Sequence, residues 1–461
     1  MRSTHSASAT RLLPIAAALL LGGTLSTAYA TNGMLMEGYG PIATGMGGAS
    51  QAIDHGNAGM AQNPATLGMM ADGTARLDLA VGVLGPDVSS EPTGMPTMVA
   101  KSGGTSYLMP ALGYTRRSGS LTYGLGVFAQ GGMGTEYGGD AFLANPGAML
   151  STPVMTNLPV RSELGVGNVI FPVAMQVNPN LTVGAALKFM WSSLDMQMTA
   201  SGSMLGQMAN ASGVAPTGNL AAAMPALGGA NWARISFSDN SDFTGAAKST
   251  GMGFTFGGVY KTDERLTVGA SYQLKSSLSD MKTSAAGASM SAEGGFVDNG
   301  RITVIDFQMP SVASIGASWK ANPELTLAAD LKHIGWSSAM KSFKMQYESA
   351  QLGGTVNFAM DQQWKDQTVL NLGMAYKANQ QLTLRAGLSL ADNPVSDTYV
   401  NPLFPAIVRN HVTLGMGYQV TPAGQINASL TMAPKVTVSS PQGMDISHSQ
   451  TNVQLMYSHS F

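Results

Sequence analysis

Apolar and polar residues alternate strictly in several segments of the chain. In the clearest segment, 381–390, leucines and one alanine occupy every second position, and between them lie Gln381, Thr383, Arg385, Gly387 and Ser389. The segments 266–275, 370–376 and 412–418 follow the same period of two. Successive side chains of a β-strand point to opposite faces, so one face of each segment suits lipid and the other suits a lumen. The pattern therefore predicts strands that cross a membrane.

A short motif occurs four times, and each copy opens an alternating strand. The copies are Asn178-Pro-Asn-Leu-Thr-Val, Asp263-Glu-Arg-Leu-Thr-Val, Asn322-Pro-Glu-Leu-Thr-Leu and Asn379-Gln-Gln-Leu-Thr-Leu. Each is a polar turn between two alternating segments. Repeated tight hairpins with long polar segments between them are typical of an up-and-down membrane β-barrel. We expect the tight turns near 117–120, 178–180, 262–265, 321–324, 378–381 and 421–425.

Six hairpins, a strand at 74–84 and a strand at 450–461 predict the fold class. It is all-β, a transmembrane antiparallel β-barrel of about 14 strands. The last strand ends in Phe461, which is typical of the C-terminal signal of outer-membrane barrels. The tight turns are expected in the periplasm. The long connections are expected outside the cell, at 85–105, 131–168, 199–250, 280–310, 337–366, 392–409 and 437–449.

Residues 1–30 have the features of a secretory signal peptide. Arg2 and Arg11 precede or flank a short apolar run, and Ala28-Tyr29-Ala30 fits the small-x-small cleavage rule. The rest of the chain has no apolar run of about 18 residues, so no transmembrane helix is expected. Only 11% of the residues are charged. Export together with barrel strands predicts the outer membrane of a Gram-negative cell.

Residues 31–73 precede the predicted barrel, 74–461, and follow a different pattern. They are rich in glycine, alanine and methionine, and they show little alternation. A disordered periplasmic tail is the alternative, but such tails are usually polar and charged. A barrel of the expected size leaves a lumen that side chains alone cannot fill. We therefore expect this segment to form an N-terminal hatch, a plug inside the lumen.

Three motifs, in this order along the chain, give a resemblance to a known family. The first is Asn63-Pro64-Ala65, preceded by the glycine-rich segment that starts at Gly45. The second is the glycine-dense strand 123–137. The third is Trp364-Lys365-Asp366, followed by a strand, a turn, another strand, Pro394-Val395 and Arg409. The chain resembles the FadL-type outer-membrane transporters of long-chain fatty acids and aromatic hydrocarbons.

The resemblance implies a specific route for a hydrophobic molecule. A groove among the third and fourth extracellular loops captures it, and an apolar lumenal pocket receives it. Movement of the hatch then opens a lateral exit near a kink in the third strand. The residues that correspond to the hatch are Gly45, Gly47, Asn63, Pro64 and Ala65. The candidates for the exit are Gly131, Gly132 and Gly134, although these glycines are also explained by crowding at a curved wall.

Two further groups of residues are candidates for ligand contact. The longest predicted loop, 199–250, carries unusual apolar surface for a loop, including Met204, Leu205, Met208, Met224 and Trp232. The alternative is that these residues pack the loop onto its neighbours. A fatty-acid carboxylate needs a cation along its path, for which Lys332, Arg385 and Arg409 are candidates. If these cations are instead paired, for instance Lys332 with Asp330, a neutral hydrocarbon is favoured.

Other functions find less support in the sequence. The chain has no Cys, no Gly-x-Ser-x-Gly, no His-Glu-x-x-His and no P-loop, so we expect no enzyme, cofactor or metal site. A net charge of −2 disfavours nucleic acid. The expected partners are a hydrophobic small molecule, outer-membrane lipid and lipopolysaccharide, and the barrel assembly machinery, with the protein a monomer. A porin for small polar solutes and a surface receptor or adhesin without transport remain the alternatives.

Overall fold

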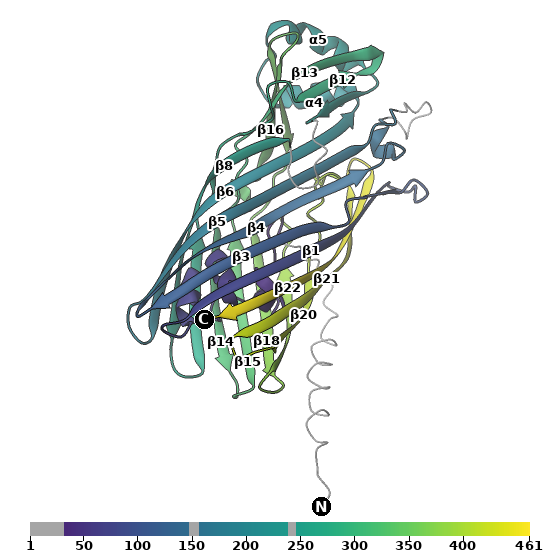
Figure 1. Ribbon diagram of the computed structural model, residues 1–461. Coiled ribbons are helices and arrows are strands. Elements are labelled where there is room, and N and C mark those ends of the chain that lie inside the picture. The colour runs from purple at the N-terminus through teal and green to yellow at the C-terminus, as the bar shows by residue number, and fades with distance from the viewer. Residues whose placement is uncertain (1–31, 147–155, 238–245) are drawn as a thin grey trace, which may run out of the picture.

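The computed structural model describes residues 32–146, 156–237 and 246–461, and the predicted signal peptide lies outside these ranges. Long tilted strands wrap into a barrel, and helices α4 and α5 lie with several short strands at one end (Figure 1). Within the described residues, no helix is both long enough and apolar enough to span a bilayer.

Antiparallel pairing runs around the barrel in one closed circuit. The long strand β1 pairs with β22 from Arg76–Ser460 to Pro92–Met444, and this seam closes the sheet. Phe461 N–H donates to Ala75 O at 2.9 Å beside the seam. In order, the circuit is β1 (Ala75–Pro92), β3 (Tyr107–Ser118), β4 (Leu121–Tyr137), β5 (Val160–Gln176), β6 (Leu181–Ala200), β8 (Ala247–Lys261), β9 (Leu266–Gln273), β14 (Val312–Lys320), β15 (Leu325–Ile334), β18 (Gln367–Lys377), β19 (Leu382–Ala391), β20 (His411–Gln419), β21 (Gly424–Ser440) and β22 (Met444–Ser460).

The expected number of about 14 strands is wrong for this sheet, which contains 22 strands in the described residues. Segments that we expected to be extracellular loops fold into further strands and two helices. Several of these strands alternate apolar and polar residues as the membrane strands do, for example Ser342–Ser349, but they lie in the long connections between tight turns and were therefore assigned to loops. They are β2 (Ala100–Lys101), β7 (Ala233–Ser236), β10 (Ser277–Leu278), β11 (Met281–Lys282), β12 (Ala288–Ala292), β13 (Phe296–Ile305), β16 (Ser342–Ser349) and β17 (Thr355–Asp361), with α4 (Gly202–Ala211) and α5 (Gly218–Gly229).

All six expected tight turns lie between paired strands, and the repeated motif has a common hydrogen-bond pattern. Its first residue is Asn or Asp, whose side-chain oxygen accepts two backbone N–H groups within the turn. Asn178 Oδ1 accepts from Asn180 and Leu181, both at 2.9 Å. The other three copies repeat this arrangement. In Asp263, the two backbone hydrogen bonds hold the pKa of the carboxyl below its usual range.

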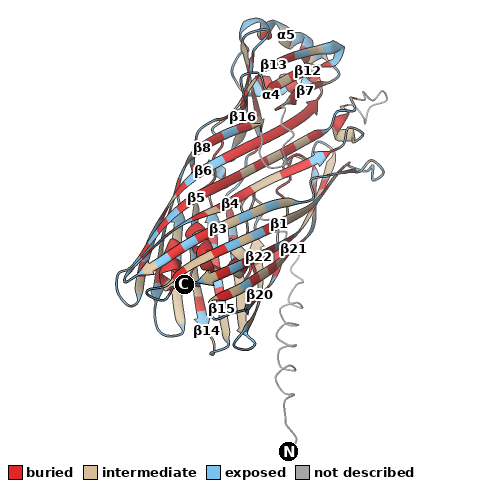
Figure 2. Ribbon diagram, viewed as in Figure 1, coloured by how far each residue is buried: buried red, intermediate tan, exposed pale blue. Residues whose placement is uncertain are grey.

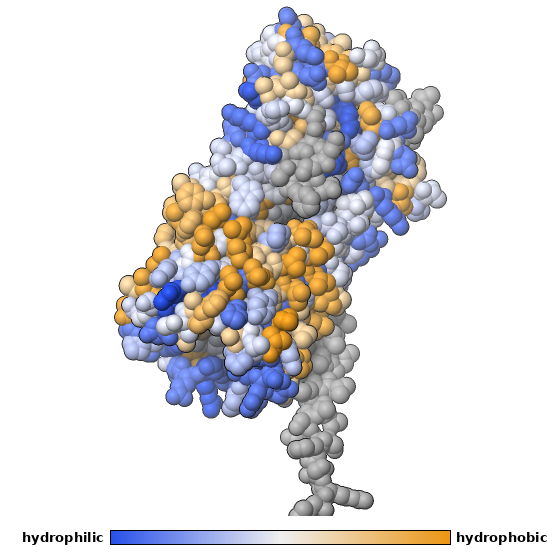
Figure 3. Space-filling model, viewed as in Figure 1, coloured by the Kyte–Doolittle hydropathy of each residue, from blue (hydrophilic) through white to orange (hydrophobic). Residues whose placement is uncertain are grey.

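Apolar side chains form a band on the outer face of the barrel. Leu79, Leu112, Phe171, Leu331 and Leu455 are examples of large apolar residues that remain exposed on the strands. In Figure 3 the hydrophobic residues gather on the barrel wall, whereas polar residues cover the tight turns and much of the opposite end. This band is the surface that a β-barrel presents to lipid.

The N-terminal segment, residues 32–73, lies inside the barrel. It folds into four short helices, and Figure 2 shows them as buried elements behind the strands. Ala43, Met60, Ala65 and Leu67 are among its fully buried residues. The helices are α2 (Gly40–Thr44), η2 (Gly56–Ala58), α3 (Gly59–Gln62) and η3 (Pro64–Met69).

Inward-facing glycines let this segment approach the wall closely. A Cβ atom on Gly387 would overlap the backbone nitrogen of Gly47, and one on Gly269 would overlap the carbonyl oxygen of Gln51. Similar contacts with the N-terminal segment occur around the barrel, at Gly113, Gly126, Gly184, Gly257, Gly373 and Gly415. The abundance of glycine therefore creates room for the N-terminal segment on many strands, and not only on β4, the glycine-dense third strand of the barrel.

The substitution Gly387→Ala tests this packing. Its methyl group requires the backbone at Gly47 to shift, so the N-terminal segment should dock less well while the strands still pair. We expect a small polar antibiotic to enter cells several-fold faster. The folded barrel should keep its normal heat-dependent shift in gel mobility, which shows that the strands still pair. Gly258→Ala is the control, because a Cβ there has no neighbour within 4 Å. Equal permeability of the two variants would contradict this role for the glycines.

Candidate functional site

The hydrogen-bonded ladder between β3 and β4 stops short of their outer ends, and we call this unpaired stretch the wall opening. Their pairing extends from the tight turn only to Ala111 and Phe128. The next residue of β3 is Pro110, which has no N–H to donate. Strand β4 continues to Tyr137 on its β5 side, with a bulge between Ala129 and Gly131. The edge of β4 above Phe128 therefore has no partner from β3.

The N-terminal segment covers this edge of β4. Gly132 N–H donates to Met34 O at 3.2 Å, and Leu35 forms a bridge with Gly131. The hydroxyl group of Tyr39 donates to Gln130 O at 2.6 Å. A Cβ on Gly131 would overlap Met34 O, so only glycine allows this contact. The predicted exit glycines Gly131 and Gly132 thus lie at the wall opening; Gly134 follows on the same strand.

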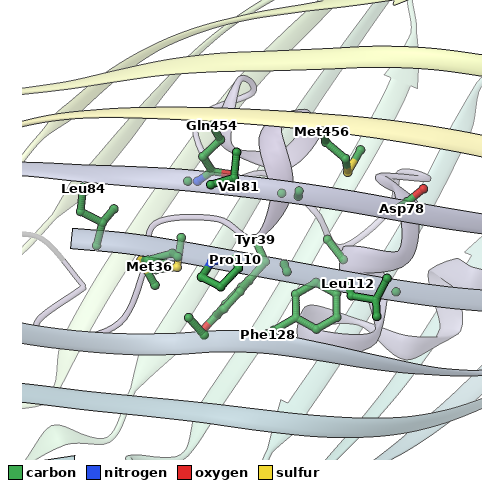
Figure 4. Close-up of a pocket in the computed structure, with 18 residues that line it drawn as sticks. Met36, Tyr39, Asp78, Val81, Leu84, Pro110, Leu112, Phe128, Gln454 and Met456 are labelled. Carbon is green, nitrogen blue, oxygen red and sulfur yellow. The ribbon is translucent and has the colours of Figure 1, made fainter. Parts of the chain in front are cut away.

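Two cavities lie on either side of Met36 and Tyr39. The wall cavity, of about 40 Å³, lies at the opening and is lined by the residues of Figure 4, including Leu84, Leu112 and Phe128. The lumenal cavity, of about 50 Å³, is more polar, with Gln62, Gln273 and Lys332 in its lining. Met36 and Tyr39 line both cavities. These two residues are therefore shared by the lumenal cavity and the wall cavity.

A methionine-rich apolar cluster fills the barrel beyond the N-terminal segment. It is continuous from Met34 to Leu205 in α4. Trp336 and Trp364 meet edge to face in it, with ring centroids 5.0 Å apart. Methionine is flexible and polarizable, so such a lining adapts to ligands of different shapes. The buried methionines include Met190, Met196, Met198, Met208, Met281, Met290, Met309, Met340 and Met345.

The motif Trp364-Lys365-Asp366 lies at the outer end of this cluster. Trp364 is buried, whereas Asp366 is exposed and accepts the backbone N–H of Ser337 at 2.9 Å. Hydrogen bonds from the Ser337 hydroxyl and backbone hold the pKa of Asp366 below its usual range. The motif thus links the segment after β15 to the start of β18.

Lys332 and Asp330, on the lumenal face of β15, bind the backbone of the N-terminal segment. Lys332 Nζ donates to Glu37 O at 3.2 Å and to Gly48 O at 3.3 Å. Asp330 Oδ2 accepts from Ser50 N–H at 2.6 Å and from Gln51 N–H at 3.1 Å. The cation takes carbonyl groups and the anion takes N–H groups, so the pair holds both kinds of backbone group.

The other two candidate cations occupy different places. Arg385 of β19 is buried and donates to Oδ1 of Asn427 of β21 at 3.1 Å, on the lumenal face of the wall. Arg409 is partly buried just before β20, and its Nε has no hydrogen-bond partner among the described residues. The three candidates therefore do not form one cluster with a shared role. Within the described ranges, no group of three or more His, Asp or Glu residues is placed to hold a metal.

The predicted hatch residues line up along the inner wall. Asn63 is fully buried and caps η3 by accepting Ala65 N–H at 3.1 Å. Its amide donates to Gln51 O at 2.8 Å and to Gly258 O at 3.2 Å, which joins the segment to β8. Pro64 occupies the first turn of η3, where its missing N–H is not needed. Gly47 N–H donates to Thr413 Oγ1 at 2.9 Å, and Gly45 contacts Gly415.

The apolar residues predicted in the longest loop lie on and after the two extracellular helices. Leu205 and Met208 are buried, and Met224 packs against the same apolar cluster. Met204 is 49% exposed on the outer side of α4. Trp232 is partly buried just before β7. Leu205, Met208 and Met224 thus pack on their neighbours in the apolar cluster, and their contact with a ligand stays a prediction.

Sequence reasoning missed Met36, Tyr39 and Gln130. Alternation gives no information about a segment that is not a strand, and Gln130 occupies a bulge. One signal was available, because Tyr39 is the single aromatic residue in 31–73. A single aromatic side chain in a segment of small residues suggests that its ring or hydroxyl group makes a specific contact with the wall.

The closed barrel, its lipid-facing band and its filled lumen define an outer-membrane transport protein. The chain belongs to the family described as outer membrane protein transport protein (OMPP1/FadL/TodX), whose model matches residues 22–460. The resemblance seen in the sequence is thereby confirmed. The protein is an outer-membrane channel of a family that transports hydrophobic compounds, and it is not an enzyme.

Solved structures of similar proteins have the same fold. The toluene transporter TodX of P. putida is 32% identical, with a TM-score of 0.81, over 92% of this chain and 99% of that one. The toluene transporter TbuX of Ralstonia pickettii is 29% identical, with a TM-score of 0.76, over the same shares.

Curated relatives are matched over shorter segments. Outer membrane protein P1 of Haemophilus influenzae is 24% identical over 172 residues, which are 37% of this chain and 35% of that protein. An uncharacterized protein of Chlorobium limicola is 43% identical over 81 residues, 18% of this chain and 39% of the relative. The chain thus spans well under half the length of each.

The pair on β15 provides a direct test of how the N-terminal segment is held. In Asp330→Asn, the backbone N–H groups of Ser50 and Gln51 lose a charged acceptor, which is worth roughly 1.5–3 kcal/mol. Hydrogen exchange at these two amides should accelerate at least tenfold. Lys320→Met, at an exposed strand end, is the control. Unchanged exchange at Ser50 and Gln51 would show that Asp330 does not hold the segment.

Proposed function

We propose that this protein lets neutral hydrophobic molecules cross the outer membrane by facilitated diffusion with lateral release. The molecule enters past the extracellular helices and passes along the methionine-rich cluster. The N-terminal segment acts as a hatch, and its movement joins the lumenal cavity to the wall cavity. The molecule then leaves between β3 and β4 into the lipid.

One observation carries this proposal. At Gln130 and Gly132, the partner of the wall opening between β3 and β4 is the N-terminal segment, while Ser102 and Gly103 bind the same edge of β4 farther out, at Glu136. A plain porin needs no gap of this kind, because its solutes leave along the barrel axis. A gap toward lipid instead suits a molecule that prefers hydrocarbon to water.

Lateral release also has a thermodynamic advantage for such a molecule. Returning to water costs about 0.8 kcal/mol for each exposed CH₂ group. A route from an apolar lumen directly into the bilayer avoids this cost. No energy source is needed, because the gradient of the molecule itself drives net movement.

The arrangement of the lumenal cations supports a neutral substrate. Lys332, the candidate nearest the two cavities, already binds two carbonyl groups of the N-terminal segment. A carboxylate would have to compete with these bonds. The two relatives described as toluene transporters agree with a neutral hydrocarbon. Long-chain fatty acids are therefore the second candidate, with Lys332, Arg385 or Arg409 as the cation.

The apolar band supports contact with outer-membrane lipid and lipopolysaccharide, and a barrel of this kind would be inserted by the barrel assembly machinery. A monomer is sufficient for the proposed route, since both cavities lie within one chain. These partners are part of the proposal.

Uptake of labelled toluene, oleate and a small sugar tests the proposal, in cells that lack their own hydrophobic transporter. With this chain present, we expect toluene uptake to rise several-fold and oleate uptake to rise less. Sugar uptake should stay at the level of cells without the chain. An increase for oleate alone would identify a fatty-acid transporter, and an increase for sugar alone would replace the proposal with an open porin.

A further inference from the structure

The unpaired edge of β4 creates a specific requirement in a membrane. Hydrocarbon offers no hydrogen bonds, so each backbone group left without a partner is unfavourable. The bulge at Ala129–Gly131 turns Gln130 O and Gly132 N–H toward the N-terminal segment. Met34 O and the hydroxyl group of Tyr39 provide their partners. One backbone group and one side chain thus replace the missing part of β3.

Tyr39 has a second property that Met34 lacks. Its ring lies close to Pro110 and Phe128 at the wall cavity (Figure 4), and Tyr39 also lines the lumenal cavity. Its backbone N–H donates to Gln62 Oε1 at 3.3 Å, which joins it to the lumenal side. Movement of this side chain would therefore widen the passage between the cavities, which Met36 also lines, and would remove the partner of Gln130 O at the same moment.

We infer that Tyr39 is the positioning residue that keeps the lateral exit closed, through its hydroxyl bond to the Gln130 carbonyl. This inference rests on the proposed function. In the closed state the phenol ring fills the passage, and the hydrogen bond fixes the ring there. In the open state the ring swings away, and Gln130 O is without a protein partner. The bond thus sets how rarely the exit opens.

The inference separates Tyr39 from the residues that anchor the N-terminal segment as a whole. Asp330, Lys332 and Asn63 bind backbone groups on the lumenal side, away from the wall opening. Weakening those anchors should loosen the plug and let polar solutes pass. Weakening the Tyr39 bond should affect only exit into lipid, because the plug remains in place.

The substitution Tyr39→Phe is the decisive test, since it keeps the ring and removes only the hydroxyl group. In proteoliposomes or cells, the maximal rate of toluene uptake should rise about fivefold, the effect expected from losing one hydrogen bond. The toluene concentration at half-maximal uptake and the leak of a small sugar should stay unchanged. Tyr114→Phe, at an exposed lipid-facing position of β3, is the matched control and should behave like the wild type.

Each outcome has a defined meaning. A wild-type protein that takes up no hydrophobic compound would overturn the proposed function, and this inference with it. Normal wild-type uptake with no increase in Tyr39→Phe would overturn this inference alone. A parallel increase of toluene uptake and sugar leak would also overturn it, because the residue would then be an ordinary anchor of the plug.

Discussion

The structure depends on one constraint, that every backbone polar group inside a membrane must have a hydrogen-bond partner. The barrel meets it by closing β22 onto β1. Between β3 and β4 the pairing ends early, and at Gln130 and Gly132 the N-terminal segment meets the constraint instead. A part of the chain that could otherwise be a simple plug is thereby required at the wall. For this reason, the plug and the lateral opening depend on each other.

The N-terminal segment comes closest to the wall where inward positions of the strands carry no side chain. Inward glycines such as Gly387 and Gly269 bring backbone against backbone. Asp330 and Lys332 then bind N–H and carbonyl groups that the short helices leave free. In these contacts the side chain or backbone comes from a strand of the wall. In the contact at Gln130, by contrast, the side chain comes from the N-terminal segment and is that of Tyr39. This difference makes the region around Tyr39 the natural place for movement.

Sequence reasoning predicted the parts of the fold that the lipid dictates. The alternation at 381–390 and the motif that begins at Asn322 placed strands and tight turns, because lipid imposes a period of two and the turns require an Asx side chain. It failed at β12, β13, β16 and β17. Residues alternate there too, as in Ser342–Ser349, but these segments lie in long connections between tight turns, which the hairpin pattern assigned to extracellular loops. At the site, Asn63 and Gly131 were found through a motif and through glycine density. The partners of Lys332 and Gln130 were not, since they are joined by tertiary contacts to residues far away in the sequence.

A reversible tether would test the central claim most directly, that the N-terminal segment must leave the β3–β4 opening for transport. Met36 and Met109 both line the wall cavity, and the chain has no native cysteine. Cysteines at these two positions can be joined by a short, reducible cross-linker, and toluene uptake measured before and after reduction. The account predicts that uptake stops in the cross-linked protein and returns when the tether is cut. Full uptake with the tether in place would contradict it.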